Sequence, residues 1–145
     1  RDQLYRNDGM YGAASLAYTC LLRHKAPVAV CLPIFLDDRS DTPLRTNWTT
    51  PRACHDGFIN DPPKGAEVHG DTVVGNHCVC LVGFIPDKHE PSGGYFEFRN
   101  CGGTAVLGQY APSVLYPITA PGPGYGVISA SYVDQYCLEM LHLWR

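Results

Sequence analysis

Charged side chains are scarce in this chain: Asp, Glu, Lys and Arg make up 17% of the 145 residues, and the net charge is −3. The arginines are spread along the sequence and form no basic cluster. Because nucleic-acid binding depends on clustered Lys and Arg that neutralise phosphates, the sequence argues against a nucleic-acid partner. The hydrophobic fraction of 45% is too high for a disordered chain. We therefore expect one globular domain spanning residues 1–145.

Long hydrophobic runs are also missing. The longest, from Ala26 to Leu36, contains two prolines and is much shorter than the ~20 residues of a membrane-spanning helix. The sequence therefore predicts no membrane partner. It starts at Arg1 with neither an initiating Met nor a signal peptide. We interpret this start as that of a processed or excised piece.

Seven cysteines are an odd number for a disulfide framework. Four of them lie in apolar stretches, where free thiols behave as small hydrophobic side chains: Cys20, Cys31, Cys78 and Cys80. This pattern favours free thiols and a reducing, cytoplasmic location. The glycosylation sequon Asn47-Trp48-Thr49 points the other way, but a single sequon easily occurs by chance.

The first half of the chain predicts one helix and one strand. Apolar residues recur at helical spacing over residues 11–25, and Pro27 ends that helix. Residues 27–36 are rich in β-branched residues and predict a strand. Residues 37–72 predict a long connection with one short helix.

The second half predicts mostly strands. We expect strands over residues 76–84 and 94–99, joined by a hairpin loop that contains Pro, Asp and Gly. A third strand is expected over 124–129, and a closing amphipathic helix over 132–143. One helix followed by antiparallel strands is an α+β pattern.

His77 opens one predicted strand and Asn100 follows the next. If these strands form a hairpin, the two side chains lie close together. A side-chain amide beside an imidazole fixes the tautomer and orientation of the ring, as the third member of a nucleophile–base–orienter triad does. Either residue alone more often has a structural role, so the pair by itself leaves its function open.

A metal site is the competing interpretation of the polar residues. Six residues have side chains that can bind a metal: His69, His77, Cys78, Cys80, His89 and Cys101. A Cys-x-Cys pair on a strand lacks the two-residue loop that turns both thiolates toward one zinc ion, and no second cysteine pair completes four ligands. We therefore predict no metal and no cofactor.

Three blocks of sequence, in this order, resemble the papain family of cysteine peptidases. They are GNHCVCLVGF at 75–84, GYFEFRNCGGT at 94–104 and GYGVISASYVDQY at 124–136. The family has a His followed by small and apolar residues, then an aromatic-rich strand ending in Asn-Ser-Trp-Gly-Thr, then a Gly-Tyr strand. Upstream, ASLAYTCLLRHKAPVAVCL is similar to the helix and Pro-Val strand of the same family, so the resemblance spans about Ala13 to Tyr136.

The resemblance implies an antiparallel, barrel-like sheet with a packed helix, the barrel half of the papain fold. His77 matches the general base, and Asn100 matches the residue that orients the imidazole. Cys78 and Val28 match residues that line the pocket for the second substrate residue, and we include the neighbouring Asn76 among the expected substrate-binding residues.

The sequence departs from the family at the nucleophile. Nothing upstream of His77 resembles the segment that carries the family's reactive cysteine; we interpret Cys20, Cys31 and Cys54 as buried or bystander thiols. The nucleophile is therefore expected from a Cys-bearing N-terminal half, either a cleaved segment or a separate chain.

Two further departures follow Asn100. Cys101-Gly102 replaces the family's Ser-Trp, whose indole shields the Asn–His hydrogen bond; Trp48 or Tyr110 is the candidate replacement. Residues 105–120 form an insertion rich in Pro and Tyr, which we interpret as a surface loop, with covering the site or binding a partner as alternatives.

The expected function is hydrolysis of peptide bonds in a peptide or protein substrate through a thioester intermediate. Two alternatives stay open. One is a non-catalytic papain-like module that binds or regulates, which the missing Cys and Trp favour. The other is acyl transfer, as in peptide ligation or transglutamylation, by the same thioester chemistry.

Overall fold

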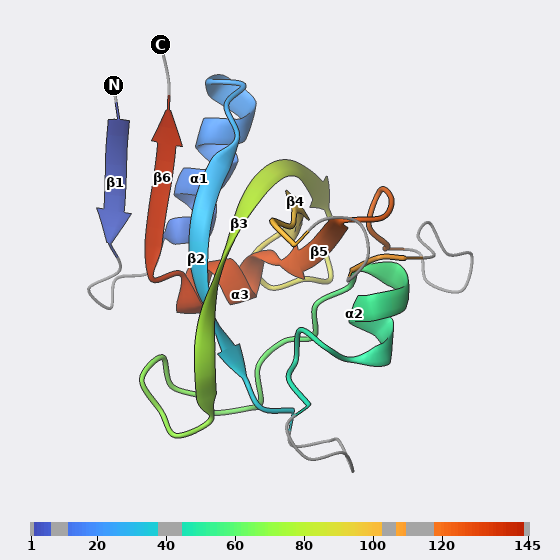
Figure 1. Ribbon diagram of the computed structural model, residues 1–145. Helices are drawn as coiled ribbons and strands as arrows, with labels where there is room; N and C mark the ends of the chain where they lie inside the picture. The colour runs from blue at the N-terminus through green and yellow to red at the C-terminus, as the bar shows by residue number, and fades with distance from the viewer. Residues whose placement is uncertain (1, 7–11, 38–44, 103–106, 110–117, 144–145) are drawn as a thin grey trace.

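The computed structural model describes residues 2–6, 12–37, 45–102, 107–109 and 118–143. It is an α+β protein with a six-stranded, antiparallel sheet and three helices (Figure 1). The helices are α1 (Ala13–Arg23), α2 (Pro51–Asp56) and α3 (Ala130–Tyr136). The strands are β1 (Asp2–Arg6), β2 (Val28–Phe35), β3 (Val73–Pro86), β4 (Gly94–Arg99), β5 (Tyr125–Ser129) and β6 (Glu139–Leu143).

The sheet is open, with the strand order β1-β6-β2-β3-β4-β5. Among the described residues β1 pairs only with β6 and β5 pairs in the ladder only with β4, so the two edges do not meet. The expected α+β class with an antiparallel sheet is confirmed, but the sheet does not close into a barrel. The long strand β3 instead arches across the molecule (Figure 1), pairing with β2 along residues 73–81 and with β4 along residues 80–86.

Helix α1 confirms the predicted first helix and packs against α3, β2 and β3. Its small side chains Ala13, Ala17 and Cys20 are buried at helical spacing, which lets the helix lie close to the sheet. The carboxylate of Asp134, in α3, accepts hydrogen bonds from the backbone N–H groups of Gly12 and Ala14, at 3.0 and 3.2 Å. The backbone N–H groups at the start of α1, which have no partner within the helix, are thus hydrogen-bonded by a side chain of α3.

The closing segment differs from its prediction. The expected helix over 132–143 is two elements: α3, which begins earlier and ends at Tyr136, and the strand β6. Met140 and His142 of β6 are buried while Leu141 between them is exposed, the two-residue alternation of a strand. The apolar residues of 132–143 fit a helical spacing, which predicts one helix where the structure has a helix and a strand. Strand β1 was not predicted.

A buried polar cluster ties the long connection after β2 to the core. The hydroxyl of Tyr132 accepts hydrogen bonds from Asn47 Nδ2 and Trp48 Nε1, each at 3.1 Å, and donates to the carbonyl of Pro33 at 2.6 Å. Burial raises the pKa of Tyr132 to about 12. Asn47 has no exposed surface and also donates to the carbonyl of Asn60. Both amide hydrogens of Asn47 are therefore used inside the fold.

No helix in the described part of the chain has the length and apolar character needed to cross a membrane.

Candidate functional site

His77 and Asn100 lie within hydrogen-bond distance, with 2.7 Å between Nε2 of the imidazole and Oδ1 of the amide. His77 is on β3 and Asn100 directly follows β4, the two strands that we expected to form a hairpin. The predicted distance between these two side chains is confirmed. Both side chains are half-buried, so the pair is accessible from solvent while one side of it rests on the core.

The backbone around each residue holds the pair in place. His77 lies opposite Leu32 of β2 and shares the core-facing side of β3 with Val79. The backbone N–H of Asn100 donates to the carbonyl of Gly124, at 2.9 Å, just before β5. The imidazole and the amide are therefore carried by neighbouring parts of one sheet rather than by free loops.

The hydrogen bond defines the tautomer of the imidazole. An amide oxygen can only accept, so Nε2 of His77 must carry the proton that it donates to Asn100. In the neutral ring the lone pair is then on Nδ1. The pair presents a base whose reactive nitrogen is Nδ1 and whose ring orientation is held by Asn100.

Trp48 packs edge-to-face on the His77 ring, with 5.1 Å between the ring centroids and an interplanar angle of 83°. The indole is 7% exposed, is held by its hydrogen bond to Tyr132, and also contacts the ring of Phe98, with 5.4 Å between centroids. Trp48 thus supplies an indole beside the pair, one of the two residues expected to do so; Tyr110 lies outside the described residues. An apolar neighbour of this kind keeps water away from one side of the imidazole.

The three residues expected to bind substrate lie in different surroundings. Asn76 and Cys78 are exposed on β3, on either side of His77. Because successive side chains of a strand point to opposite faces, both point away from the face that His77 occupies. Val28 has no exposed surface and faces Leu81 in the core, so in this structure its side chain offers no contact to a bound peptide.

All seven cysteines are free thiols. Burial raises the pKa of four of them: Cys20, Cys31 (to about 11), Cys80 and Cys137 (to about 12). Reactive cysteines need the opposite shift, a pKa lowered by a neighbouring positive charge. These four thiols therefore lack the environment of a catalytic nucleophile.

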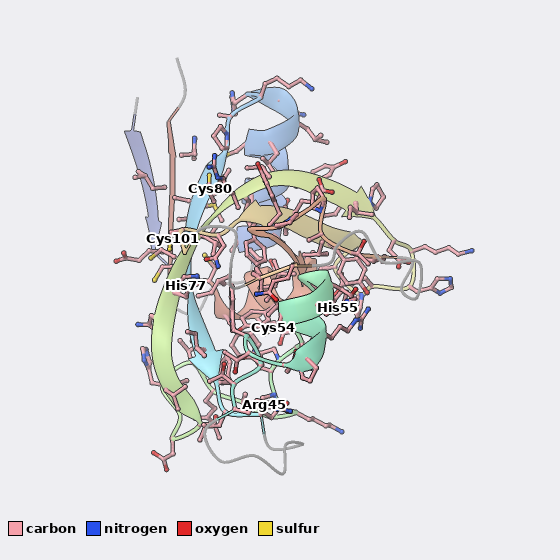
Figure 2. All side chains as sticks on the ribbon, turned by 45° about the vertical axis from the view of Figure 1, so that its right-hand side comes forward. Arg45, Cys54, His55, His77, Cys80 and Cys101 are labelled. Atoms are coloured by element: carbon pink, nitrogen blue, oxygen red, sulfur yellow. The ribbon has the colours of Figure 1, made fainter. Side chains whose placement is uncertain are left out.

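Cys54 and His55 are adjacent on the short helix α2, away from the labelled His77 on β3 (Figure 2). The short helix expected within residues 37–72 is α2: Thr50 caps it by accepting a hydrogen bond from the backbone N–H of Ala53, and Pro51 begins it. Consecutive residues on a helix also point in different directions, so the helical geometry does not place this thiol on this imidazole. His55 Nδ1 instead lies 2.9 Å from the carboxylate of the buried Asp56.

The described residues around the pair form no metal centre, and a hollow of the structure lies elsewhere. No group of three or more His, Cys, Asp or Glu side chains that could hold a metal ion occurs among the described residues. A hollow of about 660 Å³ lies between α1 and the end of β3, lined by residues that include Tyr18, Phe84 and Asp134 but neither His77 nor Asn100.

Sequence reasoning missed the polar cluster that holds Trp48. From the sequence, Asn47 belongs only to a glycosylation sequon, and Tyr132 only to the last block that resembles the papain family. A signal existed, because an Asn-Trp pair inside a long polar connection is unusual for a surface loop. The distance of 85 residues between Asn47 and Tyr132 could not be bridged from the sequence alone.

Comparison of the sequence with models of protein families and with curated proteins finds no match.

Proposed function

We propose that this chain is the His- and Asn-bearing half of a papain-like cysteine peptidase, and that a segment outside these 145 residues supplies the nucleophilic cysteine. The observation that carries the proposal is the 2.7 Å hydrogen bond from His77 Nε2 to Asn100 Oδ1 beside the indole of Trp48. An oriented imidazole next to an aromatic shield is the base-and-orienter part of a thiol peptidase site. The three sequence blocks that resemble the family support the same assignment.

In this proposal His77 Nδ1 takes the proton of the incoming thiol, and the thiolate attacks the carbonyl carbon of the peptide bond. The imidazolium then gives its proton to the leaving amine, and a thioester remains on the cysteine. Water, deprotonated by the same nitrogen, releases the acid and restores the thiol. Asn100 accepts from Nε2–H throughout and keeps Nδ1 pointed at the reacting atoms.

The cysteines of the chain support an external nucleophile. Burial raises the pKa of four of them, and the adjacent residues Cys78 and His77 point to opposite faces of β3. A thiolate from another segment, placed on the exposed side of the imidazole, completes the triad without moving any element of the sheet.

The test is a labelling experiment on the particle that this chain forms in its own cells. The particle is isolated through a tag on this chain, its intact mass is measured, and it is treated briefly with iodoacetamide near pH 6. We expect a second segment or polypeptide that carries one fast-reacting cysteine, and loss of that fast reaction in His77→Ala. A particle made of this chain alone, with no cysteine that reacts faster than a free thiol, would refute the proposal and support a non-catalytic binding module.

A further inference from the structure

Two cysteines lie directly opposite each other on neighbouring strands. Cys31 of β2 and Cys78 of β3 are Cα partners in the antiparallel ladder. Val30 and Leu32, on either side of Cys31, are buried in the core, so Cys31 points to the other face of the sheet. Cys78 is exposed on that same face. The two thiols therefore lie side by side on the surface opposite the core.

The backbone hydrogen bonds identify the kind of pair that these residues form. The carbonyl of Cys31 accepts from the N–H of Leu138, at 2.9 Å, on the β6 side of β2. Because the N–H and C=O of one strand residue point to the same side, Cys31 does not exchange backbone hydrogen bonds with Cys78. In such non-hydrogen-bonded pairs the Cα atoms are about 4.5 Å apart and the side chains are closest. A disulfide needs a Cα separation of about 4.4–6.8 Å, so the backbone needs no rearrangement.

The two thiols differ in their chemical environment. Cys31 is half-buried, and its burial together with a hydrogen bond to Cys78 raises its pKa to about 11, so it stays protonated at neutral pH. Cys78 is open to solvent and to reagents. An exposed thiol that is oxidised first, next to a shielded thiol that then resolves it, is the arrangement found in redox-sensitive cysteine pairs.

We propose that Cys31 and Cys78 are an oxidative modification site that closes to a reversible cross-strand disulfide when a hydroperoxide is present. The Cys78 thiolate attacks the terminal peroxide oxygen, the O–O bond breaks, and an alcohol or water leaves as Cys78 becomes a sulfenic acid. The Cys31 sulfur then displaces that hydroxyl as water and the S–S bond forms. Two thiols are oxidised and one hydroperoxide is reduced; a dithiol reverses the step.

Two other cysteines near this pair provide the controls. Cys80 is on the same strand and the same face as Cys78, but its cross-strand partner is Ala29, so it has no thiol opposite it. Cys137 is fully buried, and its thiol donates to the carbonyl of Glu139; burial, with a smaller contribution from the nearby Cys31, raises the pKa of Cys137. Cys80→Ser tests whether the other thiol on this face of β3 takes part in the disulfide. Cys137→Ser tests whether Cys137, rather than Cys31, reacts with the sulfenic acid on Cys78.

The experiment treats the purified full chain with hydrogen peroxide, blocks remaining thiols with an alkylating reagent, and maps the peptides by mass spectrometry without reduction. We expect a linked peptide that contains Cys31 and Cys78, lighter by two hydrogens than the two separate peptides, and lost on adding dithiothreitol. The linked peptide should persist in Cys80→Ser and Cys137→Ser and be absent in Cys31→Ser and Cys78→Ser. In Cys31→Ser the sulfenic acid on Cys78 should instead accumulate and be trapped by dimedone.

Three results would overturn the proposal: oxidation of Cys78 to the sulfinic acid with Cys31 still alkylated, a bridge that joins Cys31 to Cys137, or only disulfides between two copies of the chain. The experiment does not use peptidase activity, so its outcome is independent of the function proposed above.

Discussion

The imidazole of His77 has one nitrogen hydrogen-bonded to Asn100, and in the proposed function the other nitrogen moves a proton. Replacing His77 with Ala in the assembled particle should remove the general base and reduce peptide hydrolysis by about 10²–10⁴-fold or more. Folding should persist, because the ring is half-exposed. The measurement is steady-state hydrolysis of a peptide substrate, with His89→Ala, an exposed histidine on the hairpin loop, as the control that keeps full activity.

Asn100 should matter less than His77, since it orients the ring without transferring a proton. We expect Asn100→Ala to lower kcat by a smaller factor than His77→Ala and to leave KM close to that of the original chain.

The cysteine variants Cys20→Ser, Cys31→Ser and Cys54→Ser, measured in the same assay, should keep the hydrolytic activity. If one of these three abolishes activity while His77→Ala does not, the site lies elsewhere in the molecule.

The hydroxyl of Tyr132 has three hydrogen-bond partners in the core, namely Asn47, Trp48 and the carbonyl of Pro33. Tyr132→Phe leaves those groups buried without their partner, which costs roughly 1–3 kcal/mol in the free energy of unfolding. Urea unfolding measures this difference. Tyr18→Phe is the matched control, because the ring of Tyr18 is 41% exposed and its variant should unfold at the same urea concentration as the original chain.

Stability should also fall at alkaline pH. Burial raises the pKa of Tyr132 and Cys137 to about 12 and that of Cys31 to about 11, from ordinary values of 10 for tyrosine and 9 for cysteine. A group whose folded pKa is raised stabilises the protein below its unfolded pKa and loses that contribution as the pH rises toward the folded value. Urea unfolding between about pH 8 and 12, the titration window of these groups, should show a steady decrease in the free energy of unfolding. In Tyr132→Phe the decrease between about pH 10 and 12 should be smaller; an unchanged slope would contradict the assignment.

At the scale of the elements, the hairpin loop between β3 and β4 is tied to α3 by one carboxylate. Glu90 is 7% exposed; it accepts hydrogen bonds from the backbone N–H groups of Ser92 and Gly94 and from both the N–H and the hydroxyl of Ser131. The Glu90 carboxylate, together with a hydrogen bond between the hydroxyls of Ser92 and Ser131 at 3.2 Å, therefore holds the loop to the first turn of the helix.

Glu90→Ala should lower the free energy of unfolding by roughly 1–3 kcal/mol, because it leaves these donors without their acceptor. Chemical denaturation gives the value, and hydrogen exchange should show the largest loss of protection at Ser92 and Gly94. Glu67→Ala, at an exposed position in another loop, should change stability by no more than about 0.5 kcal/mol. Equal effects of the two variants would contradict the role given to Glu90.

The sequence predicts helices and strands well where the apolar residues follow a single spacing, either helical or alternating. The helix near the N-terminus, the strand after it and the β3–β4 hairpin were predicted within a few residues, because apolar spacing and turn residues agree there. The pair of His77 and Asn100 followed from that hairpin. The strand β6 was missed because its apolar residues also fit a helical spacing, and only pairing with β1 and β2, distant in sequence, selects the strand.

At the scale of the whole molecule, the described part of the chain exposes several large apolar side chains. They are Tyr18, Leu22, Val74, Val82 and Leu141, each 39–50% exposed. Val74 and Val82 lie on β3, the strand that carries His77. Both alternate with His77 and point to the opposite face of the strand, and apolar surface left uncovered promotes association.

We therefore expect the purified chain alone to be inactive, to bind a hydrophobic dye, and to associate as its concentration rises. Dye fluorescence and light scattering measure the two properties. Adding the Cys-bearing segment should reduce both and restore hydrolysis. A chain that stays monomeric and binds no dye at high concentration would instead favour the independent, non-catalytic module.

The position of β6 between β1 and β2 has a consequence for synthesis on the ribosome. β1 is made before its only described strand partner, β6, and Gly12 at the start of α1 is made 122 residues before the Asp134 carboxylate to which it donates. At about 5–20 residues per second the N-terminal strand and helix wait several seconds or more for these partners. β1 and the start of α1 therefore stay without these partners until α3 and β6 have left the ribosome, so this part of the fold assembles late in synthesis.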